Sequence, residues 1–288
     1  MRFAAATGLL IAAIFAVSTP SAAAVFGSDN RSRLAARDRA LSSQIGTLSS
    51  SQTGAFCTAF CAGDDLIATA SHCLYGTAAS AGPDLKDLTF KLGSARTTEH
   101  GTPLSGSSSL NQTANVASGT TRLAVEPPIG AVADWAVARL KTPACRAGHL
   151  RLSQLDPTAI RAEAARGNVY QIAVHADLPD TDLRRGAPCA IGSSFPKADA
   201  ETIARDFTAP QSILFHTCDT GGGSSGSPLL IDTPNGPEVV GINVGTYILS
   251  RNVSTARDPK QAPISEAIAN TAIWIAAIAG AVAEMGRH

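Results

Sequence analysis

The sequence predicts an all-β fold, and two local patterns together with the composition support this class. Short apolar runs rich in β-branched residues recur along the chain, separated by clusters of Gly, Pro, Ser and Asn. These runs are residues 66–70, 135–140, 169–174, 212–215, 228–231 and 239–244. Asn235-Gly236 lies between the last two runs and predicts a hairpin turn, because this pair accepts the positive φ angles that such a turn requires. Apolar residues make up 44% of the chain, which is enough for a packed core.

The first 24 residues are predicted to be a secretory signal peptide. Arg2 precedes the apolar run 9–17, and the small residues 21–24 follow it, as in a signal that ends in a cleavage site. The run is shorter than the roughly 20 apolar residues that span a bilayer, so we expect no stable membrane association. Cleavage after Ala24 would leave 264 of the 288 residues as a secreted protein.

The rest of the chain is expected to form two halves joined by a linker. Asp156-Pro157 can begin a short helix and Gly167 can end it, so residues 156–167 would separate residues 25–155 from residues 168–288. Residues 94–120 are rich in Ser, Thr, Gly and Asn, and we expect a long surface excursion there. The Ala-rich apolar stretch 268–285 is predicted to be a helix packed on the core.

Charge and cysteine content narrow the class of function. Twenty-three basic and 23 acidic residues give no net charge, so no long-range field favours binding to nucleic acid. An even count of six cysteines in an exported chain favours three disulfides. A metal site built from Cys57, Cys61, His72 and Cys73 is the alternative, but the sequence has no second paired motif, and we expect no metal.

The segment 218–228 is the most informative in the chain, because serines stand among glycines directly before an apolar run. Glycine lets successive backbone N–H groups point at one place, as an oxyanion beside a serine nucleophile requires. Such a serine needs a base that accepts its proton and an acid that orients the base. His72 ends one apolar run in T-A-S-H-C, and Asp134 begins another in A-D-W-A, so these two residues are the candidates.

These segments, with G-S-S-G-S-P at residues 223–228, resemble in order and spacing the three motifs of the chymotrypsin-like serine peptidases. The resemblance covers nearly the whole chain after residue 24. It implies His72 as general base, Asp134 as its orienting acid and Ser225 as nucleophile, with the N–H groups of Gly223 and Ser225 forming the oxyanion hole.

The same resemblance implies a fold and a reaction. The fold is two antiparallel six-stranded β-barrels with the site between them, followed by a C-terminal helix. The reaction is hydrolysis of protein or peptide substrates by a monomer that needs no cofactor. The main alternative is a catalytically silent relative that works as a binding or adhesion module, and the presence of all three candidate residues argues against it.

The chain is most similar to the bacterial glutamyl-endopeptidase branch of this family. Ser227 stands where the animal digestive enzymes have a second Gly, and residues 25–31 look like the mature start of proteins in that branch. Ser224 stands where the digestive branch has an acid that pairs with the new N-terminus. An uncharged serine cannot form that ion pair.

By resemblance, Asp219, Thr220 and Asn243 line the pocket for the side chain before the scissile bond. Asp219 favours a basic side chain, whereas the Asp-Thr pair also occurs in the glutamyl-specific branch. That branch usually has a histidine where this chain has Asn243, which carries no charge. The preference before the scissile bond therefore stays open.

The resemblance also implies how the cysteines pair, since one pair matches the family bridge beside the catalytic histidine. A second pair would link neighbouring strands of the second half, which leaves the remaining two cysteines for each other. The implied pairs are Cys57–Cys73, Cys189–Cys218 and Cys61–Cys145, and Cys61–Cys73 with Cys57–Cys145 stays open as an alternative.

A different hydrolase class can be tested on the same loop. Residues 222–226 also match the G-x-S-x-G nucleophile elbow of α/β-hydrolases, with Ser224 as nucleophile. That fold requires a histidine after the serine and the acid, and only His288 follows Ser225. The sequence therefore argues against a lipase or esterase.

Overall fold

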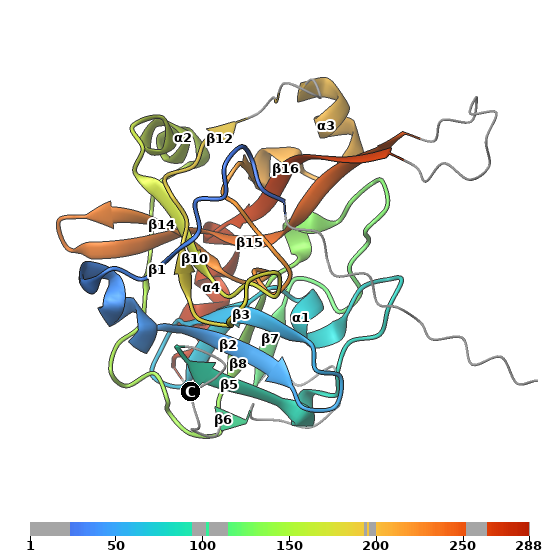
Figure 1. Ribbon diagram of the computed structural model, residues 1–288. Coiled ribbons are helices and arrows are strands. Elements are labelled where there is room, and N and C mark those ends of the chain that lie inside the picture. Colours follow the sequence, from blue (N-terminus) through green and yellow to red (C-terminus); the bar gives the residue numbers. More distant parts are fainter. Residues whose placement is uncertain are drawn as a thin grey trace, which may run out of the picture.

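The computed structural model describes residues 24–93, 102–103, 115–192, 195, 200–251 and 264–287. The predicted signal peptide up to residue 23 and most of the expected surface excursion at 94–120 lie outside the described residues. Within the described part of the chain, two β-sheets and a few short helices form the fold (Figure 1). No helix in these ranges is long and apolar enough to cross a bilayer.

The first sheet is built from the N-terminal half of the chain and is antiparallel throughout. Its seven described strands lie in the order β6-β5-β2-β3-β4-β8-β7. Their bounds are β2 (Ile45–Ser50), β3 (Phe56–Cys61), β4 (Leu66–Thr69), β5 (Leu88–Leu92), β6 (Thr102–Pro103), β7 (Val116–Ser118) and β8 (Ala136–Arg139). All four residues of β4 are buried, which fits the apolar run predicted there.

The second sheet has nine described strands in the order β1-β11-β10-β14-β15-β16-β13-β12, and β9 pairs with β15 beside this path. Their bounds are β1 (Ser32–Arg33), β9 (Arg151–Leu152), β10 (Val169–Ala173), β11 (Arg184–Arg185), β12 (Ile191–Gly192), β13 (Ile213–His216), β14 (Pro228–Thr233), β15 (Gly236–Arg251) and β16 (Ile264–Trp274). Thr233 pairs with Gly236, whose φ is +99°, so the predicted hairpin turn is confirmed.

The helices are short and lie around the sheets. The α-helices are α1 (His72–Tyr75), α2 (Pro157–Ala165), α3 (Ala200–Asp206) and α4 (Ala276–Met285), and the 3₁₀ helices are η1 (Ala36–Ser43), η2 (Leu85–Asp87), η3 (Ala131–Ala133) and η4 (Pro210–Ser212). The linker helix predicted after Asp156 is α2. It begins where the Asp156 carboxylate accepts the N–H groups of Thr158 and Ala159, both at 2.8 Å.

One cluster of buried side chains runs from the first sheet into the second. It includes Leu48 and Phe60 from the first sheet and Tyr170 and Leu230 from the second. Both sheets therefore pack on a shared core, and residues at their junction are held from two sides. The predicted class of mostly antiparallel β-structure is confirmed.

The described strand numbers differ from the six per barrel that we expected. The sheets hold seven and nine described strands, because two-residue strands extend them, β6 in the first sheet and β1, β9 and β11 in the second. Residues 32–33 and 151–152, which we assigned to the first half, pair with β11 and β15 of the second sheet. Chain segments from the N-terminal half thus brace the C-terminal sheet.

The prediction of a helix over residues 268–285 is wrong in its first part. Residues up to Trp274 belong to β16, and only Ala276–Met285 forms the C-terminal helix α4. Residues 268–273 are all buried, so both faces of this part of β16 are covered. A short, fully buried strand cannot be told from a buried helix by its apolar pattern alone.

Three disulfides hold this arrangement together. They join Cys57 to Cys73, Cys61 to Cys145 and Cys189 to Cys218. The first joins β3 near its start to α1, and the second joins the last residue of β3 to the segment after β8. The third ties the segment before β12 to the loop that follows β13.

Candidate active site

His72 and Asp134 meet at one end of two neighbouring strands. β4 and β8 pair with Thr69 opposite Ala136, His72 begins α1 just after β4, and Asp134 lies just before β8. The ring Nδ1 of His72 lies 2.7 Å from Oδ2 of Asp134. Sheet pairing therefore brings together two residues that are 62 positions apart in the chain.

The Asp134 carboxylate is fully buried, and three groups bind it. Oδ1 accepts hydrogen bonds from the Ser71 hydroxyl and the His72 backbone N–H, both at 2.9 Å, and Oδ2 faces the imidazole. A buried carboxylate is stable only when it is compensated in this way. Because Nδ1 donates to an anion, the neutral imidazole keeps its Nε2 free to accept a proton.

The charge of Asp134 also sets how readily His72 is protonated. Burial disfavours the imidazolium and would lower the pKa of His72. The negative charge of Asp134 and its hydrogen bond outweigh burial, so the pKa of His72 lies above its ordinary value of 6.5. The pair is therefore arranged to hold a proton on the imidazole.

Ser225 lies in a glycine-rich loop, residues 219–226, directly before β14. Gly226 has a φ of +81°, and a Cβ there would lie 2.0 Å from Oγ1 of Thr69. Gly223 has a φ of +90°, and a Cβ there would lie 2.3 Å from the Phe56 ring. Both positions therefore require glycine, as the sequence pattern indicated.

Thr58 of β3 fastens this loop to the first sheet. Its backbone N–H donates to the Ser225 carbonyl at 2.9 Å, and its hydroxyl donates to the Gly223 carbonyl at 2.9 Å. The same hydroxyl oxygen accepts the N–H of Val174 at 3.0 Å. Sequence analysis did not identify Thr58, since its only signal was a polar residue between Cys57 and Cys61 in a strand.

His72, Gly223 and Ser225 line one cavity of about 390 Å³. Its walls are largely apolar, and none of the residues that line it is Lys, Arg, Asp or Glu. The apolar contributors include Leu48, Ala55, Phe56, Pro83, Leu88 and the Cys57–Cys73 disulfide. The cavity thus joins the two candidate catalytic side chains to an uncharged pocket.

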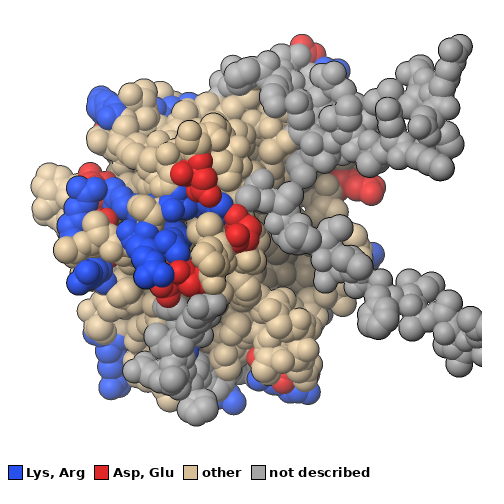
Figure 2. Space-filling view, viewed as in Figure 1, with Lys and Arg blue, Asp and Glu red and all other residues tan. Residues whose placement is uncertain are grey.

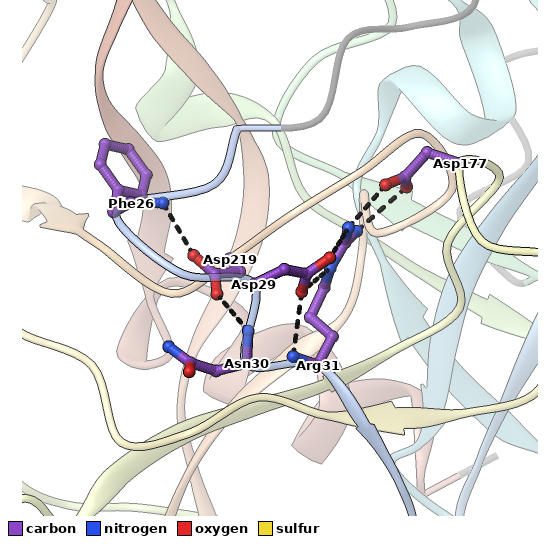
Figure 3. A network of polar contacts seen from close by, with 6 residues as sticks. All are labelled: Phe26, Asp29, Asn30, Arg31, Asp177 and Asp219. Atoms are coloured by element: carbon purple, nitrogen blue, oxygen red, sulfur yellow. Dashed lines mark hydrogen bonds and ion pairs between the residues drawn. The ribbon is translucent and has the colours of Figure 1, made fainter.

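Asp219 and Thr220 contact the start of the described chain, and Figure 3 shows the contacts of Asp219. The Asp219 carboxylate accepts the backbone N–H of Phe26 at 2.8 Å on one oxygen and that of Asn30 at 3.0 Å on the other. Thr220 and Ala24 exchange two backbone hydrogen bonds, both of 3.0 Å. Both side chains are buried, so Asp219 is bound within the protein.

Asn243 lies behind the loop in a neutral hydrogen-bonded chain. Its amide group donates to the carbonyl of Ser224 at 3.0 Å, and its Oδ1 lies 3.1 Å from Nε2 of His216. The Cys218 N–H donates to Nδ1 of His216, so Nε2 carries the proton and donates to Asn243. Burial lowers the pKa of His216 to about 3, although the bond to Asn243 acts in the opposite direction.

Two groups of side chains have the spacing of metal ligands, and one of them contains His72. They are Cys57, His72 and Cys73, and Cys189, His216 and Cys218. All four cysteines are in disulfides, whereas a cysteine binds a metal ion as a thiolate. Neither group is therefore suited to hold a metal ion.

The family of the chain is shown by its sequence. A family model for the trypsin-like peptidase domain matches residues 57–242, which include His72, Asp134 and Ser225. The match spans more than half of the chain, so the chain belongs to the trypsin-like peptidase family. It is accordingly a serine peptidase, a hydrolase that acts on peptide bonds. No curated protein matches the sequence.

Two solved structures are similar in fold. A Glu endopeptidase in complex with MPD is 17% identical with a TM-score of 0.56, and the match covers 92% of this chain and 100% of that one. The thermostable serine protease AL20 from an extremophilic microorganism is 16% identical with a TM-score of 0.52, covering 86% and 99%. At these identities the likeness shows the fold alone.

Protonation of the two buried histidines should make the fold sensitive to acid. Burial lowers the pKa of His175 and of His216 to about 3, against 6.5 ordinarily. The unfolded chain therefore binds these protons below about pH 6.5, and the folded chain binds them only near pH 3. The free energy of unfolding should fall with decreasing pH in this window, by about 1.4 kcal/mol per unit for each histidine. Urea unfolding at stepped pH measures the slope.

His216→Gln is the matched test of this slope, because glutamine can still donate to Asn243 but does not titrate. It should make the slope shallower by about 1.4 kcal/mol per pH unit. The control His149→Gln, at an exposed position, should leave the slope unchanged. An unaltered slope in His216→Gln would contradict the role given to this group.

Proposed function

We propose that the protein is a secreted serine endopeptidase that cleaves peptide bonds with a His72, Asp134 and Ser225 triad. The observation that carries the proposal is that His72 and Ser225 line one and the same cavity, with His72 held by buried Asp134. Three disulfides support secretion, because such bonds persist in oxidising compartments.

The reaction uses these groups in two steps. Nε2 of His72 takes the proton of the Ser225 hydroxyl as its oxygen attacks the substrate carbonyl, and the N–H groups of Gly223 and Ser225 stabilise the resulting oxyanion. His72 then gives the proton to the leaving amine, which leaves an acyl-enzyme on Ser225. Water attacks the acyl group with His72 again as base, and this releases the second product. Asp134 stays ionised throughout and stabilises the imidazolium.

The cavity beside the site indicates which side chains the enzyme accepts after the scissile bond. His72 must protonate the leaving amine, so the leaving side of the substrate lies against His72 and the pocket that it lines. That pocket is uncharged and largely apolar. We infer a preference for a bulky apolar residue shortly after the scissile bond.

Asp219, Thr220 and Asn243 are the residues predicted to contact the substrate side chain before the scissile bond, and none of them offers it an unpaired charge. Both oxygens of Asp219 are bound by the N–H groups of Phe26 and Asn30, and Asn243 is bound within the protein. Thr220 carries no charge. We infer that neither a basic nor an acidic residue is required before the scissile bond.

Removal of the nucleophile is the first test. Ser225→Ala should lower peptide hydrolysis by several orders of magnitude, because no other group can form the acyl-enzyme. A fluorophosphonate probe should label the wild type and not this variant. Matching circular dichroism and urea midpoints would show that both are folded. A folded wild type that never labels, or a variant that retains hydrolysis, would overturn the proposal.

The pH dependence of turnover tests the role of His72. Since neutral imidazole is the active form and its pKa is raised, kcat/KM should increase with pH and reach half its plateau above pH 6.5. Asp134→Asn removes the charge that raises this pKa while burial remains. Its half-plateau should move to lower pH, and turnover should fall about 10⁴-fold. An unshifted profile would contradict the assignment of the titrating group to His72.

A cleavage profile on a mixed peptide library tests the substrate preferences. We expect bulky apolar residues to be enriched just after the scissile bond, and no enrichment of Lys, Arg, Asp or Glu before it. Ala81→Trp would fill the cavity from an exposed loop position and should remove the apolar preference.

Ala79→Trp is the control, because Ala79 is exposed in the same loop and does not line the cavity. Its profile should match that of the wild type. Equal apolar enrichment in both tryptophan variants would show that the cavity does not select the leaving side.

A further inference from the structure

The segment that follows the predicted cleavage site forms a strap, residues 25–33, that lies across the glycine-rich loop (Figure 3). Asp219 of the loop accepts the N–H groups of Phe26 and Asn30. The strap ends in β1, which pairs with β11. The strap, which contains none of the candidate catalytic residues, therefore holds the loop that carries Ser225.

Arg31 is the centre of the strap, and its side chain is only 2% exposed. The guanidinium binds Asp29 through Nε at 2.9 Å and Nη2 at 2.7 Å. It binds Asp177 through Nη1 at 3.0 Å and Nη2 at 2.6 Å. A buried guanidinium that is paired by two carboxylates in fork geometry fixes the position of both partners.

Asp177 and Arg31 also lie directly against the loop. A Cβ on Gly221 would be 1.8 Å from Oδ1 of Asp177 and 2.8 Å from Nη1 of Arg31. Gly221 therefore has to be glycine to let this ion cluster approach. The cluster touches the loop four residues before Ser225.

The residue before Asp177 controls the orientation of one peptide group. The Ala176 N–H donates to the Gly222 carbonyl at 2.6 Å. In a trans peptide the C=O and the following N–H point in opposite directions. When Ala176 holds the Gly222 carbonyl, the Gly223 N–H must point away from Ala176. Gly223 and Ser225 line the same cavity.

We infer that Arg31 and Asp177 are positioning residues that keep the Gly222–Gly223 peptide in the orientation needed for the oxyanion hole. This inference rests on the proposed peptidase function. Arg31 holds Asp177, the neighbouring Ala176 N–H holds the Gly222 carbonyl, and the Gly223 N–H is thereby presented to the oxyanion. A flip of this peptide would turn a carbonyl oxygen toward the developing negative charge.

The test compares Arg31→Ala and Asp177→Ala with the wild type by steady-state kinetics on one peptide. The loss of one oxyanion donor typically lowers turnover by about 10²–10³-fold. Because a loosened peptide still visits the correct orientation, we expect kcat to fall about 10- to 100-fold. KM should stay nearly constant, since the ground-state contacts are unchanged. Asp177→Ala is the milder variant, because Arg31 remains paired with Asp29.

Arg33→Ala is the matched control. Arg33 lies in the same strap and pairs with Asp180 and Asp182, but its side chain is 70% exposed. Its kcat should equal that of the wild type. Hydrogen exchange adds a direct readout: peptides covering residues 219–226 should exchange faster in Arg31→Ala and Asp177→Ala, and those covering β2 should not change.

The outcomes separate this inference from the proposed function. A wild type that does not react with the fluorophosphonate would overturn both. Reactive wild type with an undiminished kcat in folded Asp177→Ala would overturn only the role of the strap. A fall in kcat that equals the unfolded fraction found by urea denaturation would do the same.

Discussion

The contact of Thr58 with the glycine-rich loop is the interaction on which the site depends most. His72 and Asp134 flank strands of the first sheet, whereas Ser225 precedes a strand of the second. The two sheets must therefore hold a defined position relative to each other for the three side chains to meet. Thr58 is fully buried and binds the carbonyls of Gly223 and Ser225 together with the N–H of Val174. One side chain and its backbone thus help to align the two sheets, because hydrogen bonds are directional whereas apolar packing has little directionality.

The two sides of the loop are held by different chemistry. Behind it, Asn243 and His216 form a buried neutral chain, in which burial keeps the imidazole uncharged. In front of it, Arg31 and its carboxylates form a charged cluster. Figure 2 shows basic side chains gathered with acidic ones on one face of the molecule. On the paired strands β1 and β11, Arg33, Arg184 and Arg185 are all in ion pairs. Charge therefore holds the loop in place while the cavity at Ser225 stays neutral.

The sequence predicted those strands and turns that depend on short local patterns of residues. All six apolar runs became inner strands of the two sheets, and the glycines at 223 and 226 took the positive φ angles that the loop motif required. Residues 45–50 were not predicted as β2, because Gly, Thr and Ser interrupt their apolar pattern. Residues 268–274 were predicted as helix because a strand buried on both faces lacks the alternation that identifies strands. These failures share one cause, since burial by distant elements decided the outcome.

Long-range contacts explain why the site could be predicted only in part. Asp219 was expected to face the substrate, since its position six residues before Ser225 suggested a pocket wall. In the fold, the strap reaches it from 189 positions away and binds its carboxylate. Local spacing cannot reveal a partner at that distance. An aspartate a few residues before a nucleophile can therefore anchor the loop as well as contact a substrate. The sequence motif is the same in both cases, and the hydrogen bonds of the folded chain show which groups the aspartate binds.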